Sequence, residues 1–382
     1  MLGSLPGGST TGQRQAGEGE KCVKMKQYQL KEVSKAKLKI LEKYFPAWVR
    51  ILGSRNPTLV FVDCFAGAGR YPGGEEGSPL LILQKARDTI QDFKSSLTIL
   101  VIFVEKNKTS AKHLKANILK GLPESLKVAV FNEDAHDFIP KLLEAIPRGM
   151  PAFFFIDPYG HPLTIPVMNQ ILSRPRTEIL LNLMWYAINM HLSNPRTRQA
   201  IDKMFGHSDW YGQPFMWARQ YERENQFVDY FLSQLEAHYK LKFRIRFSPE
   251  DDVPGGWHRT KYYLIHLSNH PKAALLMKEV MWSLGDEMGT FDFSARPQKR
   301  LFPQTPQVDE LIQYLQQHYV GSGRVLTFGE LREETWELPF IRKHYRKAIR
   351  HLEGEGKVWI ERVKSQRTGI RDKNKLHFVT EA

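Results

Sequence analysis

The stretch FVDCFAGAGR, residues 61–70, joins an apolar run to a glycine-rich turn. The run Thr58–Asp63 predicts a buried β-strand that ends in a carboxylate. Gly67 and Gly69 allow the backbone to adopt positive φ or to approach a ligand closely. Pro72 stands where the dinucleotide fingerprint G-x-G-x-x-G requires glycine, which argues against NAD. The stretch predicts a ligand-binding turn or, as the simpler alternative, an ordinary strand-to-helix connection.

Apolar strands alternate with helical patterns after this turn. The predicted strands are Leu97–Glu105, Lys127–Phe131, Ala152–Asp157 and Glu178–Met184, followed by a close pair at Phe243–Phe247 and Tyr262–Leu267. Helical patterns cover Ser78–Phe93, with Ser78 as the N-cap, and Thr109–Lys120, Phe138–Ala145 and Pro166–Ser173. Strands that are apolar on both faces and separated by helices predict an α/β fold with a doubly wound parallel sheet, which ends in an antiparallel pair.

Two further helical regions flank this alternation. One covers residues 29–52, and Pro46 is expected to kink or split it. Lysines recur every four residues on one side of this helix: Lys31, Lys35, Lys39 and Lys43. The other, residues 190–240, is rich in aromatic side chains, most of which are expected to pack in a core.

Acidic residues also follow the second and third predicted strands. Glu105 closes the second strand and Asp134 follows the third, so that with Asp63 they would lie on one edge of the sheet. This arrangement fits S-adenosylmethionine (SAM), with Asp63 on its amino group, Glu105 on its ribose hydroxyls and Asp134 on its adenine. Phe65 would pack beside the cofactor. Taken alone, Glu105 is better explained as an exposed loop residue.

The most specific motif is FIDPYGHP at residues 155–162. Methyltransferases that act on base amines carry (Asp/Asn)-Pro-Pro-aromatic at this place. The Asp157 carboxylate and the Pro158 carbonyl would accept the two N–H bonds of an exocyclic amine. Tyr159 would stack on a flipped-out base, and His161 is expected to be a turn residue. The alternative is a proline-rich turn with no catalytic role.

The net charge of +14 is concentrated at the two ends of the chain. Residues 1–56 carry +7 and residues 339–375 carry +8, which points to a partner rich in phosphate. Cys22 and Cys64 show no metal-binding spacing, so no metal site is predicted, and a reducing, cytoplasmic location is expected. No run of 18 apolar residues predicts a membrane span.

The chain is predicted to divide at the proline-rich segment 295–306. We expect a disordered leader (1–27), a methyltransferase-like domain (28–295), a linker (296–305) and a winged helix-turn-helix domain (306–382). Nucleic-acid contacts are predicted for the recognition helix and wing of the last domain: Arg342, Lys343, Arg346, Lys347, Arg350, Arg367, Arg371 and Lys373. The alternative is a winged helix that binds protein and whose charges are only solvated.

The sequence resembles the three-Cys-motif partner proteins (TcmP) from about Lys35 to Trp282. The likeness is carried by KLKILEKYFPAWVRIL, FVDCFAGAGRY with EGSPLLIL, FIDPYGHPLTIPVMNQIL, RTEILLNLMWYAIN and KYYLIHLSNHP. It implies a Rossmann-like class I methyltransferase fold that uses SAM. It also implies a companion protein that bears a three-cysteine motif. It does not imply a settled substrate.

Together these features predict SAM-dependent methyl transfer to an exocyclic base amine of nucleic acid. Tyr159-Gly160 follows Pro158 with no second proline, which resembles the Asp-Pro-Phe-Gly motif of some tRNA guanine-N2 methyltransferases. Adenine N6 and guanine N2 therefore both stay open as targets, as do RNA and DNA. The rival hypothesis is a catalytically silent adaptor of the same fold that binds nucleic acid and the three-Cys-motif partner.

Overall fold

A computed structural model describes residues 32–93, 97–118, 121–247, 256, 259–285, 291–293, 308–363 and 368–380. The predicted leader and linker, together with Lys31 and Arg367, lie outside the described residues. Within the ranges given, no helix combines the length and the apolar character that crossing a membrane requires.

The larger domain is built on an eight-stranded sheet in the order β3-β2-β1-β4-β5-β7-β6-β8. The strands are β1 (Thr58–Asp63), β2 (Thr98–Val104), β3 (Leu126–Phe131), β4 (Ala152–Ile156), β5 (Thr177–Leu183), β6 (Tyr239–Arg246), β7 (Thr260–Ser268) and β8 (Asp292–Phe293). β1 to β5 are parallel, and β7 is antiparallel to both β5 and β6. The predicted parallel sheet and its antiparallel pair are confirmed, whereas β8 was not predicted.

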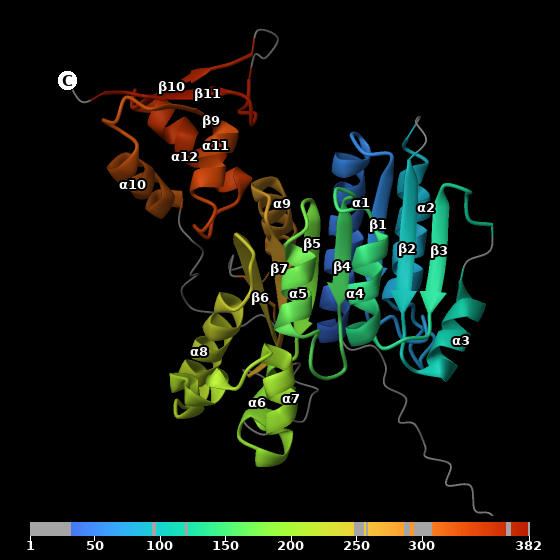
Figure 1. Ribbon diagram of the computed structural model, residues 1–382. Coiled ribbons are helices and arrows are strands. Elements are labelled where there is room, and N and C mark those ends of the chain that lie inside the picture. The colour runs from blue at the N-terminus through green and yellow to red at the C-terminus, as the bar shows by residue number, and fades with distance from the viewer. Residues whose placement is uncertain are drawn as a thin grey trace, which may run out of the picture.

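Helices cover both faces of the sheet (Figure 1). One face packs against α1 (Glu32–Gly53), α2 (Ser78–Ile90), α3 (Lys108–Asn117) and α9 (Pro271–Trp282). The other packs against α4 (Ala135–Ala145), α5 (Ile165–Leu172), α6 (Trp185–Leu192), α7 (Arg198–Phe205) and α8 (Gln220–Ser233). The arrowheads of β2, β3 and β4 point to the lower edge in Figure 1, so the residues that follow these strands gather at that edge.

Two local predictions differ from the structure. α1 continues through Pro46 without splitting. A proline inside a helix removes one hydrogen bond, but the burial of Phe45 and Trp48 on either side of it outweighs that loss. Ser78 is not the N-cap of α2, because Gly77 takes that position and the Ser78 hydroxyl bonds to Asp63 instead.

The insert that follows β5 has an aromatic core of its own. Trp210, Phe215, Phe227 and Phe231 are fully buried there. Tyr211, Trp217 and Tyr221 are exposed instead, so the prediction that most of the rings pack in a core is met only in part. Phe215 and Phe227 meet edge to face, with ring centroids 5.3 Å apart. α6 and α7 lie at the lower edge in Figure 1, so this insert lies beside the carboxyl ends of the parallel strands.

Residues 308–363 and 368–380 form a second domain with a separate hydrophobic core. Its elements are α10 (Val308–His318), β9 (Val325–Thr327), α11 (Phe328–Glu334), α12 (Arg342–Gly354), β10 (Val358–Glu361) and β11 (Lys375–Phe378). The strands make an antiparallel sheet in the order β10-β11-β9. In Figure 1 this C-terminal domain lies beside α9, at the edge opposite to the strand arrowheads.

α9 joins the larger domain to the C-terminal domain. Lys278 of α9 donates hydrogen bonds from Nζ to the carbonyl oxygens of Trp336 and Leu338. The next residue, Glu279, accepts a hydrogen bond of 2.8 Å from the backbone N–H of Arg342, at the start of α12. Burial lowers the pKa of Lys278 to about 7. The contact therefore fixes the beginning of α12 against the larger domain.

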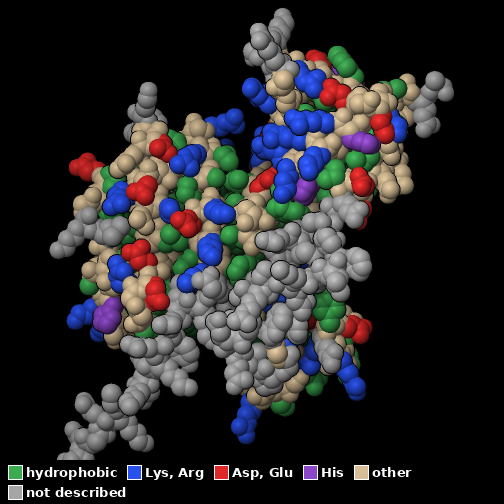
Figure 2. Space-filling view, turned by 180° about the vertical axis from the view of Figure 1, so that it is seen from behind, with side chains coloured by type: hydrophobic (Ala, Val, Ile, Leu, Met, Phe, Trp, Pro, Cys, Tyr) green, Lys and Arg blue, Asp and Glu red, His purple; other side chains and the backbone are tan. Residues whose placement is uncertain are grey.

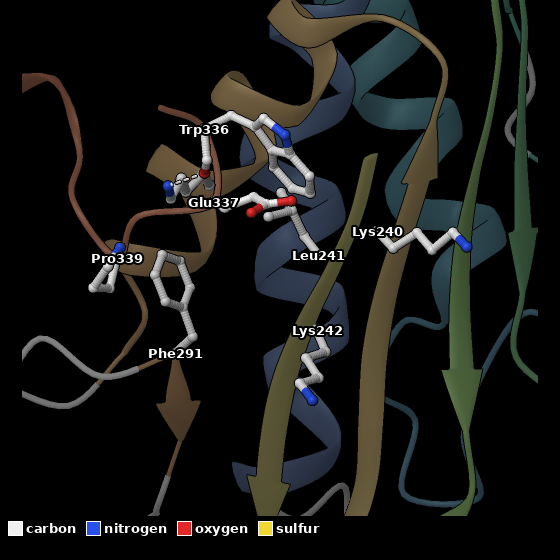
Figure 3. Close-up of a pocket in the computed structure, with 8 residues that line it drawn as sticks. Lys240, Leu241, Lys242, Phe291, Trp336, Glu337 and Pro339 are labelled. Atoms are coloured by element: carbon white, nitrogen blue, oxygen red, sulfur yellow. Dashed lines mark hydrogen bonds between the residues drawn. The ribbon is translucent and has the colours of Figure 1, made fainter. Parts of the chain in front are cut away.

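A hollow of about 270 Å³ lies beside this contact (Figure 3). It is lined by residues of both domains: Lys240, Leu241, Lys242, Lys278, Phe291, Trp336, Glu337 and Pro339. In Figure 3 the amino groups of Lys240 and Lys242 point away from Trp336. Asp157 is not among its lining residues, so this hollow is separate from the predicted active site.

Candidate active site

The turn after β1 is built around Asp63, whose side chain is fully buried. Its Oδ1 accepts a hydrogen bond from Phe65 N at 3.2 Å, and its Oδ2 accepts one from Ser78 Oγ at 2.7 Å. Burial raises the pKa of Asp63 to about 7, although these two hydrogen bonds lower it. Asp63 thus ties the turn to the start of α2, and its contact with a cofactor stays a prediction.

The glycine turn and Glu105 lie together at the sheet edge. Glu105 Oε2 accepts a hydrogen bond from Gly67 N at 2.8 Å, and its Oε1 accepts one from Asn107 N at 2.6 Å. Gly67 and Gly69 have φ of +65° and +80°, which favours glycine at both positions. A Cβ on Gly67 would meet no atom within 4 Å, whereas one on Gly69 would lie 2.9 Å from Leu114 Cδ1. The backbone at Gly67 therefore borders open space.

Asp134 is placed at the same edge but caps a helix. Its Oδ1 accepts a hydrogen bond from His136 N at 3.0 Å, which satisfies the beginning of α4. Its Oδ2 lies 2.8 Å from Lys106 Nζ, and this hydrogen bond holds the pKa of Asp134 well below its usual range. Phe65 packs nearby, edge to face with His136 at 6.5 Å between ring centroids. The sequence did not predict the capping role.

Asp157 follows β4 at this edge, and both of its carboxylate oxygens have partners. Oδ1 accepts a hydrogen bond from Asn182 Nδ2 at 2.6 Å. Oδ2 forms an ion pair of 2.5 Å with Lys37 Nζ, in which the two side chains are 15% and 14% exposed. Asn182 lies in β5 and Lys37 in α1, so three elements converge on one carboxylate.

Lys37 and Asn182 are site residues that the sequence analysis missed. Burial lowers the pKa of Lys37, but Asp157 and the hydroxyls of Tyr71 and Tyr262 raise it above its ordinary value overall. Asn182 is 2% exposed, and its Oδ1 has no hydrogen-bond partner among the residues that the structure describes. A buried acceptor thus stands next to Asp157, where a donor from a ligand would satisfy it.

The residues after Asp157 form an exposed turn. Tyr159 is 93% exposed, so its ring is free to contact a large ligand. His161 Nε2 lies 3.1 Å from His191 Nδ1 of α6, which connects the turn to the insert. Burial, with a contribution from His191, lowers the pKa of His161. In the described ranges no cluster of three or more His, Cys, Asp or Glu side chains is arranged to hold a metal ion.

The predicted basic residues divide into two groups in the C-terminal domain. Arg342 pairs with Asp372 at 3.1 Å and Arg346 Nε donates to Ile370 O at 3.1 Å, so these two arginines also hold α12 to the following loop. The other described members are exposed: Lys343, Lys347, Arg350, Arg371 and Lys373. Figure 2 shows Lys and Arg side chains gathered where the C-terminal domain borders the larger domain.

No protein-family model and no curated protein matches the chain. Among solved structures, an O-methyltransferase from Bacillus cereus in complex with SAH is 13% identical, with a TM-score of 0.31 over 59% of this chain and 80% of that one. Protein LPL1258 from Legionella pneumophila is 12% identical, with a TM-score of 0.34 over 63% and 90%. Precorrin-6y C5,15-methyltransferase from Geobacter metallireducens is 10% identical, with a TM-score of 0.29 over 62% and 87%.

Proposed function

We propose that this protein is a SAM-dependent methyltransferase that acts on an exocyclic amine of a nucleic-acid base. The observation that carries the proposal is the arrangement of Asp157, Asn182 and Tyr159 on one sheet edge with the Gly67 turn and Glu105. Ligands of open α/β sheets bind at the carboxyl ends of the parallel strands. The strand order, with an antiparallel β7 between β5 and β6, is also that of class I methyltransferases.

The residues at this edge fit SAM. Gly67 borders open space, so its backbone can approach a ligand closely. The two oxygens of Glu105 each accept one backbone hydrogen bond, and a carboxylate has about four lone-pair sites, which leaves capacity for two ribose hydroxyls. Asp134 is the weaker candidate because its oxygens already cap α4 and pair with Lys106. Bound SAM would supply an electrophilic methyl group.

Asp157 and Pro158 would orient the amine. The lone pair of an exocyclic amine is delocalised into the base, so it becomes nucleophilic only when acceptors hold its N–H bonds. Asp157, the carbonyl of Pro158 and the unpartnered Oδ1 of Asn182 are acceptors at this place. Such preorganised acceptors bind more strongly as positive charge develops on the nitrogen. The exposed ring of Tyr159 would stack on the base.

We further propose that the C-terminal domain is a winged helix that binds nucleic acid through α12. The support is its element order and the exposed Lys343, Lys347 and Arg350 on that helix. Nucleic-acid binding would position the substrate through phosphate contacts. A three-Cys-motif companion protein and a cytoplasmic location remain predictions from the sequence.

A catalytically silent adaptor is the second candidate, and one observation favours it. Lys37 and Asn182 already occupy both oxygens of Asp157, so a target amine must share or displace one of these partners. An adaptor would keep this network only to stabilise the fold. It would bind nucleic acid without turnover.

Methyl transfer from radiolabelled SAM, assayed side by side on total RNA and total DNA, separates the two candidates. The proposal predicts that label enters one of these pools and that the Asp157→Ala variant loses the transfer. Digestion to nucleosides would then identify the methylated base. An absence of transfer to both pools, with intact SAM and nucleic-acid binding, would favour the adaptor.

A further inference from the structure

α1 begins beside the Asp157 site and packs along α9, which contacts the C-terminal domain. Near its beginning, Lys37 faces inwards and pairs with Asp157. Lys35, Lys39 and Lys43 are spaced by four residues and share one face, on which Lys35 and Lys39 are half-buried and Lys43 is exposed. With a rise of 1.5 Å per residue, these three lysines span about 12 Å of the helix axis. α1 therefore begins at the catalytic edge and carries a row of basic side chains away from it.

The row meets α9 and then α12. Lys43 Nζ donates a hydrogen bond of 2.9 Å to Ser283 Oγ, directly after the end of α9. The preceding residue, Trp282, has Lys343 Nζ of α12 5.5 Å from its ring centroid. Lys43 and Lys343 are both exposed. These contacts connect Lys43 of α1, through Ser283 and Trp282, with the basic helix of the C-terminal domain.

Charge distinguishes this face from the opposite face of the sheet. α1 carries five Lys and Arg against two Glu, and α12 carries five against one. α4 and α5, on the other face, together carry one Lys and two acidic residues. Two acidic residues on the basic face pair with cations outside the lysine row: Glu42 with Lys85 at 2.8 Å and Glu279 with Arg332 at 3.3 Å.

We propose that α1, the end of α9 and α12 form one basic track that guides the phosphate backbone of a nucleic-acid strand from the C-terminal domain to Asp157. The proposal rests on the proposed function, because it assumes a nucleic-acid substrate. A row of cations spaced over about 12 Å matches a phosphate backbone better than a compact anion. The track explains how a domain at the opposite edge of the sheet can deliver substrate to the catalytic edge.

The test uses the full chain with three single charge reversals. Lys43→Glu and Lys343→Glu alter two separate points of the track, while Lys141→Glu alters an exposed lysine of α4 on the opposite face as the matched control. Fluorescence anisotropy would measure binding of RNA and DNA oligonucleotides of one sequence over a range of salt concentrations. Calorimetry with SAM would check that the cofactor site is intact in each variant.

Each track variant should bind the preferred oligonucleotide about ten-fold more weakly at low salt, and its log–log salt slope should fall by about 0.7–0.9 for each lost phosphate contact. A variant that carries both Lys43→Glu and Lys343→Glu should combine the two losses, whereas Lys141→Glu should match the unaltered protein. Comparing the affinities for RNA and DNA shows which of the two nucleic acids the track binds.

The proposal is overturned if Lys43→Glu binds like Lys141→Glu, or if the unaltered protein binds neither oligonucleotide. These outcomes differ from a failure of the proposed function. If the Lys43→Glu variant still transfers methyl groups and binds nucleic acid as tightly as the unaltered protein, the proposed methyltransferase function stands and the proposed track is wrong. If nucleic-acid binding depends on Lys43 and Lys343 but no methyl transfer is detected, the proposed track stands and the adaptor is favoured over the enzyme.

Discussion

Replacing Asp63 by Asn should make the stability of the protein less dependent on pH. The Asp63 carboxyl is fully buried, and burial raises its pKa from 3.8 to about 7. Asparagine is nearly isosteric and can keep both hydrogen bonds, because its Oδ1 can accept from Phe65 N and its Nδ2 can donate to Ser78 Oγ. The substitution therefore removes the ionisation and preserves the contacts.

The sign follows from proton binding. Because the pKa is raised in the folded state, the protonated carboxyl contributes stability that is fully present below pH 3.8 and is lost as the pH rises to about 7. A shift of about 3 pKa units corresponds to about 4 kcal/mol in total. Between pH 5 and pH 8 the free energy of unfolding of Asp63→Asn should therefore gain about 2–3 kcal/mol relative to the unaltered protein.

Urea unfolding followed by tryptophan fluorescence at pH 5, 6, 7 and 8 would measure this difference. Asp88→Asn is the matched control, because Asp88 is exposed and pairs with Arg87 rather than with a histidine. The difference in free energy of unfolding between this variant and the unaltered protein should not change with pH. If the difference in free energy of unfolding between Asp63→Asn and the unaltered protein stays constant from pH 5 to pH 8, Asp63 is not a buried, poorly solvated acid. Calorimetry on the same variant tests its predicted contact with SAM, whose loss should cost about 1.5–3 kcal/mol.

Three further predictions concern the candidate site. Asp157→Ala should fold and bind nucleic acid but lose about a hundred- to a thousand-fold in turnover, and a near-normal rate in a single-turnover assay would exclude an amine-orienting role. Tyr159→Ala should weaken substrate binding by about 1–3 kcal/mol while Tyr159→Phe should not, so equal binding by both variants would contradict base stacking. Gly67→Ala should destabilise the turn by about 1–2 kcal/mol, because φ is +65° there, and should weaken SAM binding measured by calorimetry; unchanged affinity would place the cofactor elsewhere.

The sequence predicted the sheet well because its strands are apolar on both faces. β1, β4 and β5 are continuous buried runs, which leave little ambiguity about type or position. The acidic residues after β1, β2 and β3 were also placed on one edge correctly. That part of the site follows from chain order in a parallel sheet, and so it can be read without any knowledge of tertiary contacts.

The partners of those residues could not be predicted in the same way. Lys37 precedes Asp157 by 120 residues, and nothing in the lysine pattern of α1 marks it as the one that turns inwards. Ser78 matched the signal for an N-cap, but its hydroxyl donates a hydrogen bond to Asp63 instead. Leaving a buried carboxylate without a donor costs more free energy than leaving a helix end without a side-chain cap. Tertiary hydrogen bonding decided both cases.

The place of β7 between β5 and β6 has a consequence for synthesis on the ribosome. β5 is complete at Leu183, but the strand that pairs with its free edge begins only at Thr260. At about 5–20 residues per second, translation of the intervening chain takes about 4–15 s. During that time a strand that is fully buried in the finished fold has an unpaired edge, and such edges promote aggregation. Nascent chains that stall before residue 260 should therefore depend on chaperones, and fragments that end there should be insoluble.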